Sequence, residues 1–262
     1  MAGQPAPPPL PAFFEYAAEP SWRAVEFISD LHLTSELPAT FERWALYMRE
    51  TSADAVFILG DLFEVWVGDD VRAMGGFEAD AADVLAQSAS RRTLGFMAGN
   101  RDFLVGVDLL RDCGMLALPD PTVLDAWGQR VLLSHGDALC LADVGYQAYR
   151  AEVRSPAWRR AVLARPLAER LQLARTMRDA SQAHQRSQVT WADVDPAAAV
   201  AWMHAVGAHD LVHGHTHRPG SEVIAPGFAR HVLSDWDCDA SPRRAQVLRL
   251  TRDGFARIEL GP

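Results

Sequence analysis

DAVFILGD, residues 54–61, is the stretch that decides the fold: five apolar residues in succession lead into a glycine and an aspartate. A continuous apolar run of this length that ends in turn residues is typical of a strand buried on both faces. Four other runs share the pattern, AVEFISD (24–30), TLGFMAGN (93–100), RVLLSHGD (130–137) and HDLVHGHTH (209–217). We therefore predict buried parallel or mixed strands that present polar side chains at their carboxyl ends.

Helical patterns separate the first three of these runs, at about 37–51 and 77–90. The alternation of strands and helices predicts an α/β fold. Near the carboxyl end, residues 230–237 and 245–260 have the pattern of strands, and Asp253-Gly254 marks the turn between the last two.

The pattern changes between residues 141 and 206, which are rich in alanine and arginine. Apolar residues recur there at helical spacing, and Pro156 and Pro166 are expected to start or break helices. From 150 to 190 the segment has nine arginines against three acidic residues. We predict a helical insertion over the edge of the sheet, serving either as a solvated helical hairpin or as a lid over an anionic, acylated ligand.

Length and composition limit the remaining possibilities. A chain of 262 residues fits one α/β domain at 23–262, and the proline-rich segment 1–22 is expected to be a disordered leader because it lacks the basic start of a signal peptide. The net charge of −9 disfavours general nucleic-acid binding. Every basic residue is arginine, which excludes catalysis by a lysine nucleophile or Schiff base.

Three cysteines without CxxC spacing argue against a disulfide framework or a zinc–thiolate site, and they indicate a reduced, cytoplasmic protein. The apolar runs are too short to cross a membrane.

The polar residues at the strand ends form a set of metal-ligand types. The set comprises Asp30, His32, Asp61, Asn100, His135, His215 and His217. Oxygen and imidazole ligands together suit Mn²⁺, Fe²⁺, Zn²⁺ or Co²⁺. Seven groups exceed the need of one ion, so the sequence predicts two metal ions bridged by a carboxylate. His213 is left out because, one residue before Gly214, it points to the other face of its strand.

The ordered series D-x-H, GD, GN, HGD and GH-x-H resembles the calcineurin-like metallophosphoesterase superfamily. The resemblance implies a β-sandwich flanked by helices and a two-metal hydrolase of phosphoesters or phosphoanhydrides. It assigns Asp30, His32 and His217 to one metal ion and Asn100, His135 and His215 to the other. Asp61 would bridge the two ions.

Longer strings resemble the UDP-2,3-diacylglucosamine hydrolase family from Val25 onward: FISDLHLT, ILGDLFEVWVGDD, GNRDFLVG, LLSHGDALCLADVGYQAYR and VHGHTHRP. This resemblance implies water attack on the α-phosphorus of an acylated UDP-sugar in lipid A biosynthesis, giving UMP and 2,3-diacylglucosamine 1-phosphate. It implies two divalent ions, with Mn²⁺ expected, and a peripheral position on the cytoplasmic face of a Gram-negative inner membrane. No nucleic-acid partner and no obligate protein partner are expected.

Arg101 stands where many phosphoesterases have a histidine. Arginine stays protonated, so it stabilises charge on a phosphoryl group but does not act as a general acid. A sugar 1-phosphate leaves without a proton, whereas an alkoxide needs one. Arg101 therefore favours a pyrophosphate substrate, and we predict that Asn100 and Arg101 act in catalysis.

The family resemblance also implies which residues contact the substrate. The substrate-binding positions are Asn100, Arg101, Asp143, Ser181, Gln185, Gln188 and His215. Gln185 stands where the family has asparagine, and the family's nearby lysine is absent. Two alternatives remain: another dinuclear phosphoesterase, such as a dinucleoside polyphosphate hydrolase or a nuclease, and a non-catalytic scaffold with a relic site. The complete ligand set disfavours the scaffold.

Overall fold

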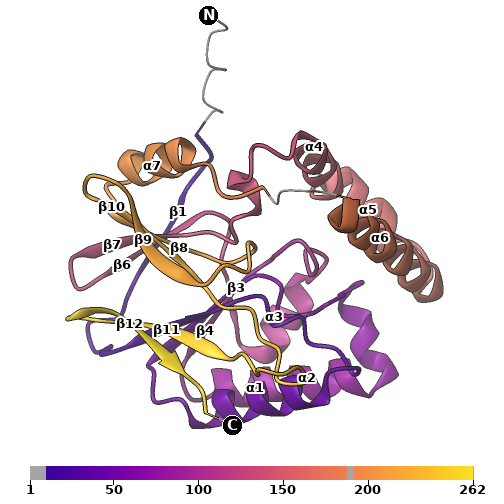
Figure 1. Cartoon of the computed structure of the whole chain (residues 1–262). Helices are drawn as coiled ribbons and strands as arrows, with labels where there is room; N and C mark the ends of the chain where they lie inside the picture. The colour runs from indigo at the N-terminus through magenta and orange to yellow at the C-terminus, as the bar shows by residue number, and fades with distance from the viewer. Residues whose placement is uncertain (1–9, 188–191, 262) are drawn as a thin grey trace, which may run out of the picture.

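The computed structural model describes residues 10–187 and 192–261, with side chains described up to Arg178 and again from Ala192. Two six-stranded sheets face each other, and helices cover their outer faces (Figure 1). This arrangement is the predicted α/β fold with a β-sandwich at its centre.

The first sheet contains the strands that follow one another early in the chain. Its order is β12-β11-β2-β3-β4-β5. Strands β2 to β5 run parallel, and β11 pairs antiparallel with both β2 and β12. The bounds are β2 (Val25–Ile28), β3 (Ala55–Leu59), β4 (Thr93–Met97), β5 (Leu116–Ala117), β11 (Gln246–Thr251) and β12 (Gly254–Glu259).

The second sheet has the order β1-β6-β7-β8-β10-β9. Strand β8 lies between β7 and β10 and is parallel to both, whereas β6–β7 and β9–β10 are antiparallel pairs. The bounds are β1 (Phe14–Ala17), β6 (Thr122–Ala126), β7 (Gln129–Leu133), β8 (Asp210–His213), β9 (Gly220–Ala225) and β10 (Phe228–Val232). All five apolar runs of the sequence form strands, as predicted.

Three apolar layers hold the domain together. Between the sheets, side chains such as Phe27 and Phe57 pack against Leu124 and Val212. Outside the first sheet lie α1 (Pro38–Glu50), α2 (Phe77–Ala89), α3 (Val107–Cys113) and the 3₁₀ helix η1 (Asp69–Met74), around the fully buried Trp44. Outside the second sheet lie α7 (Pro196–Ala205) and the short η2 (Asp137–Leu139).

Helices α4 (Val144–Val153), α5 (Pro156–Leu163) and α6 (Leu167–Ser187) form a helical arm that lies beside the two sheets (Figure 1). Pro156 is at the first position of α5, where its missing N–H costs no helical hydrogen bond. The arm has a small core of its own, built with two residues that follow β4: Phe103, Leu104, Val153, Val162, Trp158, Leu173 and Met177.

Two boundaries differ from the sequence predictions. Strand β1 lies inside the expected disordered leader 1–22, so that expectation is wrong for this part of the chain; β1 pairs with β6, and Tyr16 packs against Trp22 and Phe57. Helix α7 lies inside the expected insertion 141–206, but its Trp202 and neighbours pack on the outer face of the second sheet. Among the described residues, no helix is long and apolar enough to cross a membrane.

Candidate metal centre

The seven predicted ligands lie in the turns that follow β2, β3, β4, β7 and β8, at one edge of the facing sheets. Five of them have the left-handed backbone conformation that non-glycine residues rarely adopt: Asp30 (φ 54°), His32 (47°), Asp61 (52°), His215 (66°) and His217 (51°). Such strain persists only where the surrounding structure enforces it, and it concentrates at functional sites.

Backbone hydrogen bonds tie the first two turns together. The N–H groups of Leu31 and His32 both donate to the carbonyl of Asp61, at 2.9 and 3.0 Å. An isolated parallel bridge between Leu33 and Phe63 extends the pairing beyond the strands. Backbone contacts alone therefore fix the predicted ligands that follow β2 relative to the one that follows β3.

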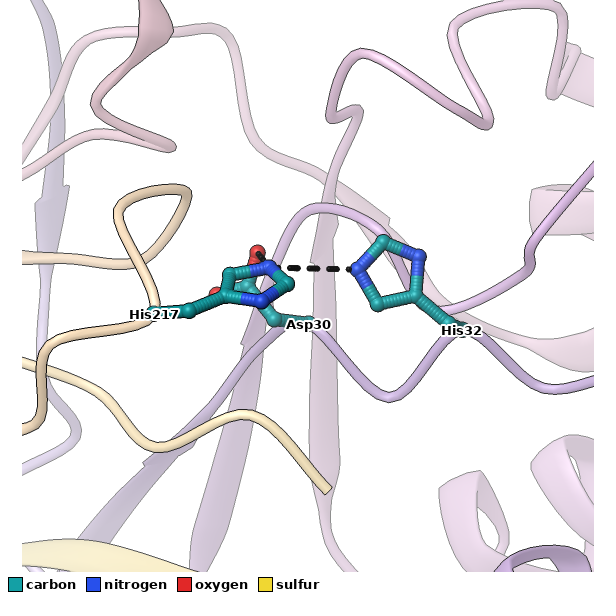
Figure 2. A group of neighbouring side chains, drawn as sticks. All are labelled: Asp30, His32 and His217. Atoms are coloured by element: carbon teal, nitrogen blue, oxygen red, sulfur yellow. Dashed lines mark hydrogen bonds and ion pairs between the residues drawn. The ribbon is translucent and has the colours of Figure 1, made fainter. Parts of the chain in front are cut away.

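Asp30, His32 and His217 form the first cluster (Figure 2), and their ligand atoms all lie within 4.8 Å of one another. The Nε2 atoms of His32 and His217 are 3.3 Å apart, and Nε2 of His217 is 3.4 Å from Oδ1 of Asp30. Asp30 is fully buried and accepts the backbone N–H of His215. Burial by itself raises the pKa of Asp30, but the hydrogen bond and charges of the nearby imidazoles outweigh it, so the pKa lies below its usual range.

Asn100, His135 and His215 form the second cluster. The Oδ1 atom of Asn100 is 2.9 Å from Nε2 of His135 and 2.9 Å from Nδ1 of His215. Nδ1 of His135 lies 2.9 Å from the carbonyl of Leu59, which only accepts, so Nδ1 carries a proton and the neutral imidazole has its lone pair on Nε2. Burial lowers the pKa of His215 to about 4, so this imidazole is neutral near pH 7.

The Asp61 carboxylate lies between the two clusters. Its Oδ1 is 3.7 Å from Nε2 of His135, and its Oδ2 is 3.8 Å from Nε2 of His32. Asp30, Asp61 and His135 also bring ligand atoms within 4.8 Å of one another. This is the position that a bridging ligand needs.

The chemistry of the donor set fits a divalent cation. The amide oxygen of Asn100 faces Nε2 of His135 and Nδ1 of His215, each at 2.9 Å, so three atoms of ligand type lie together. The clusters also combine imidazole nitrogens and carboxylate oxygens, the donors that borderline divalent cations take.

Asp102 holds the turns after β3 and β4 in place, a role that was not predicted from the sequence. Its buried carboxylate accepts the backbone N–H groups of Leu62 (2.8 Å) and Gly99 (2.7 Å), and that of Asp61 at 3.4 Å. Asp102 belongs to the GNRDF string, which could have marked it as a site residue. Only the structure shows that its side chain points toward the backbone N–H groups of the two turns.

Asp137, of the HGD string, was also missed as a site residue. It is fully buried, two residues after His135 in the sequence, and it pairs with Arg150 (2.8 Å) and Arg154 (3.2 Å) of the helical arm. Arg154 also donates to the carbonyl of Gly99 at 3.0 Å. The arm is thus attached directly to the turns that present the second cluster.

A cavity of about 430 Å³ runs from the candidate metal centre into the helical arm. Asn100, Arg101 and Glu64 line its end at the candidate centre. The side-chain Nε of Arg101 is buried and has no hydrogen-bond partner among the described residues. The rest of the lining is mainly apolar and includes Phe103, Leu104, Trp158, Val162, Leu173 and Met177.

The other predicted substrate contacts are placed less fully. Asp143 caps the amino end of α4, where it accepts the N–H of Tyr146 at 2.9 Å, and it is not part of the cavity lining. Ser181 and Gln185 lie on α6, but their side chains are outside the described part of the structure. Gln188 lies outside the described residues altogether.

Comparison of the sequence found curated relatives of nearly the same length. The chain is 42% identical over 243 residues to a UDP-2,3-diacylglucosamine hydrolase of Xanthomonas oryzae pv. oryzae (strain PXO99A), covering 88% of this chain and 96% of the relative. It is 41% identical over 245 residues to a protein of the same name from Stenotrophomonas maltophilia (strain K279a), covering 88% and 98%. A search of family models found no match.

Comparison of the structure found more distant neighbours. An archaeal phosphodiesterase aligns with a TM-score of 0.45 and 11% identity, over 90% of this chain and 99% of the neighbour. Vacuolar protein sorting 29 from Cryptosporidium parvum aligns with a TM-score of 0.46 and 14% identity, over 92% and 99%.

Gly99→Ala is expected to weaken binding of a divalent cation by more than about tenfold, because the added Cβ would lie 2.1 Å from Oδ1 of Asp61 and 2.4 Å from its backbone nitrogen. Calorimetric titration with Mn²⁺ measures the effect, and circular dichroism checks the fold. Gly220→Ala is the control, since its Cβ would have nothing nearer than 3.9 Å. Unchanged Mn²⁺ affinity in Gly99→Ala would show that the close approach is unimportant.

Proposed function

The chain belongs to the UDP-2,3-diacylglucosamine hydrolase family, and we propose that it catalyses the hydrolysis named for that family. Water attacks the α-phosphorus of UDP-2,3-diacylglucosamine, and the bond from that phosphorus to the oxygen bridging the two phosphates breaks. The bridging oxygen leaves with the β-phosphate. The products are UMP and 2,3-diacylglucosamine 1-phosphate, an intermediate of lipid A biosynthesis. One observation carries the proposal: an apolar cavity opens onto a phosphoesterase ligand set at Arg101.

We propose that two divalent metal ions, Mn²⁺ in the cell, occupy the two clusters. Asp30, His32 and His217 would hold one ion, Asn100, His135 and His215 the other, and Asp61 both. Such a pair, when bound, lowers the pKa of water and neutralises charge on phosphoryl oxygens. The protein's part is to present these ligands in a fixed, strained geometry at the mouth of the cavity.

Arg101 is proposed to hold the phosphates of the substrate. Its backbone N–H donates to Oδ1 of Asp61 at 2.8 Å, which fixes the residue beside the bridging ligand. Its guanidinium lines the cavity and stays positive at any pH of the cell. It therefore stabilises negative charge on the pyrophosphate without supplying a proton, and a phosphate-monoester leaving group needs none.

The cavity in the arm is proposed to receive the acyl chains. Its lining by Phe103, Trp158, Leu173 and Met177 offers apolar surface continuous with the end formed by Asn100 and Arg101, and this favours an acylated substrate over a dinucleoside polyphosphate or DNA. Asp143 and Ser181 remain the proposed contacts to the sugar and nucleotide. Gln185, Gln188 and His215 remain proposed substrate contacts.

The outer surface of the arm supports a peripheral position at the membrane. Leu163 of α5 is exposed, on the part of the chain with the excess of arginine. Apolar side chains with cationic neighbours are the combination that binds anionic lipid surfaces. We propose that the protein works at the cytoplasmic face of a Gram-negative inner membrane, without an obligate protein partner.

Incubation with UDP-2,3-diacylglucosamine and Mn²⁺ tests the function. Mass spectrometry should find UMP and 2,3-diacylglucosamine 1-phosphate in equal amounts, and a chelator should abolish turnover. Asp61→Ala is expected to be inactive because both clusters lose their shared ligand. Turnover of dinucleoside polyphosphates or DNA with none of the acylated substrate would contradict the proposal.

Arg101→Ala is expected to lower kcat about 100-fold and to change KM much less, because the guanidinium acts on charge that develops in the transition state. Steady-state kinetics on the acylated substrate measure both constants. A rise in KM with unchanged kcat would place Arg101 in ground-state binding only.

Ala174→Trp is expected to fill the cavity, which Ala174 lines next to Leu173. The kcat/KM for UDP-2,3-diacylglucosamine should fall at least tenfold, since the acyl chains lose their space. Turnover of a small activated phosphodiester, which needs no cavity, serves as the internal control and should be retained. Equal loss on both substrates would mean that the cavity does not receive the chains.

A further inference from the structure

We propose that Glu64 and Arg178 are positioning residues that orient the proposed metal ligand His32 and join it to helix α6 of the arm. This inference rests on the proposed metal centre and deepens it. In consequence, the arm would contribute to cation binding even when no substrate is present.

Glu64 lies beside His32 because their two turns are paired. The backbone N–H of Glu64 donates to the carbonyl of Leu33 at 3.1 Å, next to the bridge between Leu33 and Phe63. This pairing brings Oε2 of Glu64 to 3.0 Å from Nδ1 of His32. Only 15% of the Glu64 side chain and 18% of the His32 side chain are exposed, so water competes weakly for this contact.

The contact with Glu64 selects the form of His32 that can bind a cation. A carboxylate oxygen at 3.0 Å favours the proton on Nδ1, because its negative charge attracts an N–H and repels a lone pair. The lone pair of Nε2 then faces His217 at 3.3 Å and Asp61 at 3.8 Å, inside the first cluster. A carboxylate on the second nitrogen is the usual means by which proteins orient a metal-binding imidazole.

Arg178 forms an ion pair with the other oxygen of the same carboxylate. Its Nε is 2.9 Å from Oε1 of Glu64, so the two oxygens are divided between the histidine and the arm. Without this cation Glu64 could rotate and give up its contact with His32.

Contacts made by another residue of helix α6, Arg170, fix the position of Arg178. Two turns earlier, Arg170 is 4% exposed and donates to the carbonyl of Val67 and to the carboxylate of Asp70. Both partners lie in the segment that follows Glu64. The helix is therefore attached to the same loop that carries Glu64, and Arg178 approaches from a fixed direction.

Calorimetric titration of the full-length protein with Mn²⁺, without substrate, tests the inference. The wild type should bind two ions. Glu64→Ala should weaken one of the two sites about 10- to 100-fold and leave the other nearly unchanged. Arg178→Gln, a milder change, should weaken the same site less. Arg175→Gln is the matched control, because Arg175 is an exposed arginine on the same helix, and it should match the wild type.

The outcomes separate the two proposals. Two Mn²⁺ sites of unchanged affinity in both Glu64→Ala and Arg178→Gln would overturn the inference while leaving the metal centre intact. A raised KM with unchanged Mn²⁺ affinity would instead make Arg178 a substrate contact, which also overturns it. A wild type that binds fewer than two ions would refute the proposed metal centre itself. Thermal unfolding confirms that each variant is folded.

Discussion

The close contact between the turns that follow β3 and β4 is the constraint on which the site depends. Gly99 approaches Asp61 so closely that a methyl group would overlap its carboxylate, and Asp102 accepts backbone N–H groups from both turns. The packing of the two turns directs the Asp61 side chain between the first cluster, at His32, and the second cluster, at His135. A glycine and a buried carboxylate thus determine where the shared ligand lies.

The sequence was sufficient to predict the five buried strands that lead into the predicted ligands, and the turns that follow them. Burial on both faces requires continuous apolar runs, and parallel strands bring their carboxyl ends to one edge, so residues as distant as Asp30 and His217 meet. Strand β1 and the packing of helix α7 on the second sheet were not predicted. Prolines surround β1, and α7 continues the alanine-rich segment of the predicted insertion, whereas their places in the fold depend on contacts with Phe57 and with the second sheet.

The residues that hold the predicted ligands in place were harder to predict from the sequence than the ligands themselves. Asp102 and Glu64 stand in recognisable strings, but no spacing rule says that one carboxylate turns toward backbone N–H groups and the other toward His32. Arg154 and Arg178 were counted only as part of an arginine excess, since their partners lie far away in the sequence. The arm therefore combines two features. Its interior is apolar and suits a lipid, and two of its guanidinium groups contact residues beside the candidate metal centre.

The five ligands with left-handed backbone carry strain of about 1–3 kcal/mol each when nothing compensates it. Ions bound only by the native state would offset this cost and stabilise that state by mass action. Folding and metal binding would then be linked equilibria, so the unfolding temperature of the protein would rise with the concentration of free metal ion. A cell short of the metal would hold a less durable protein, more open to degradation, as well as a less active one.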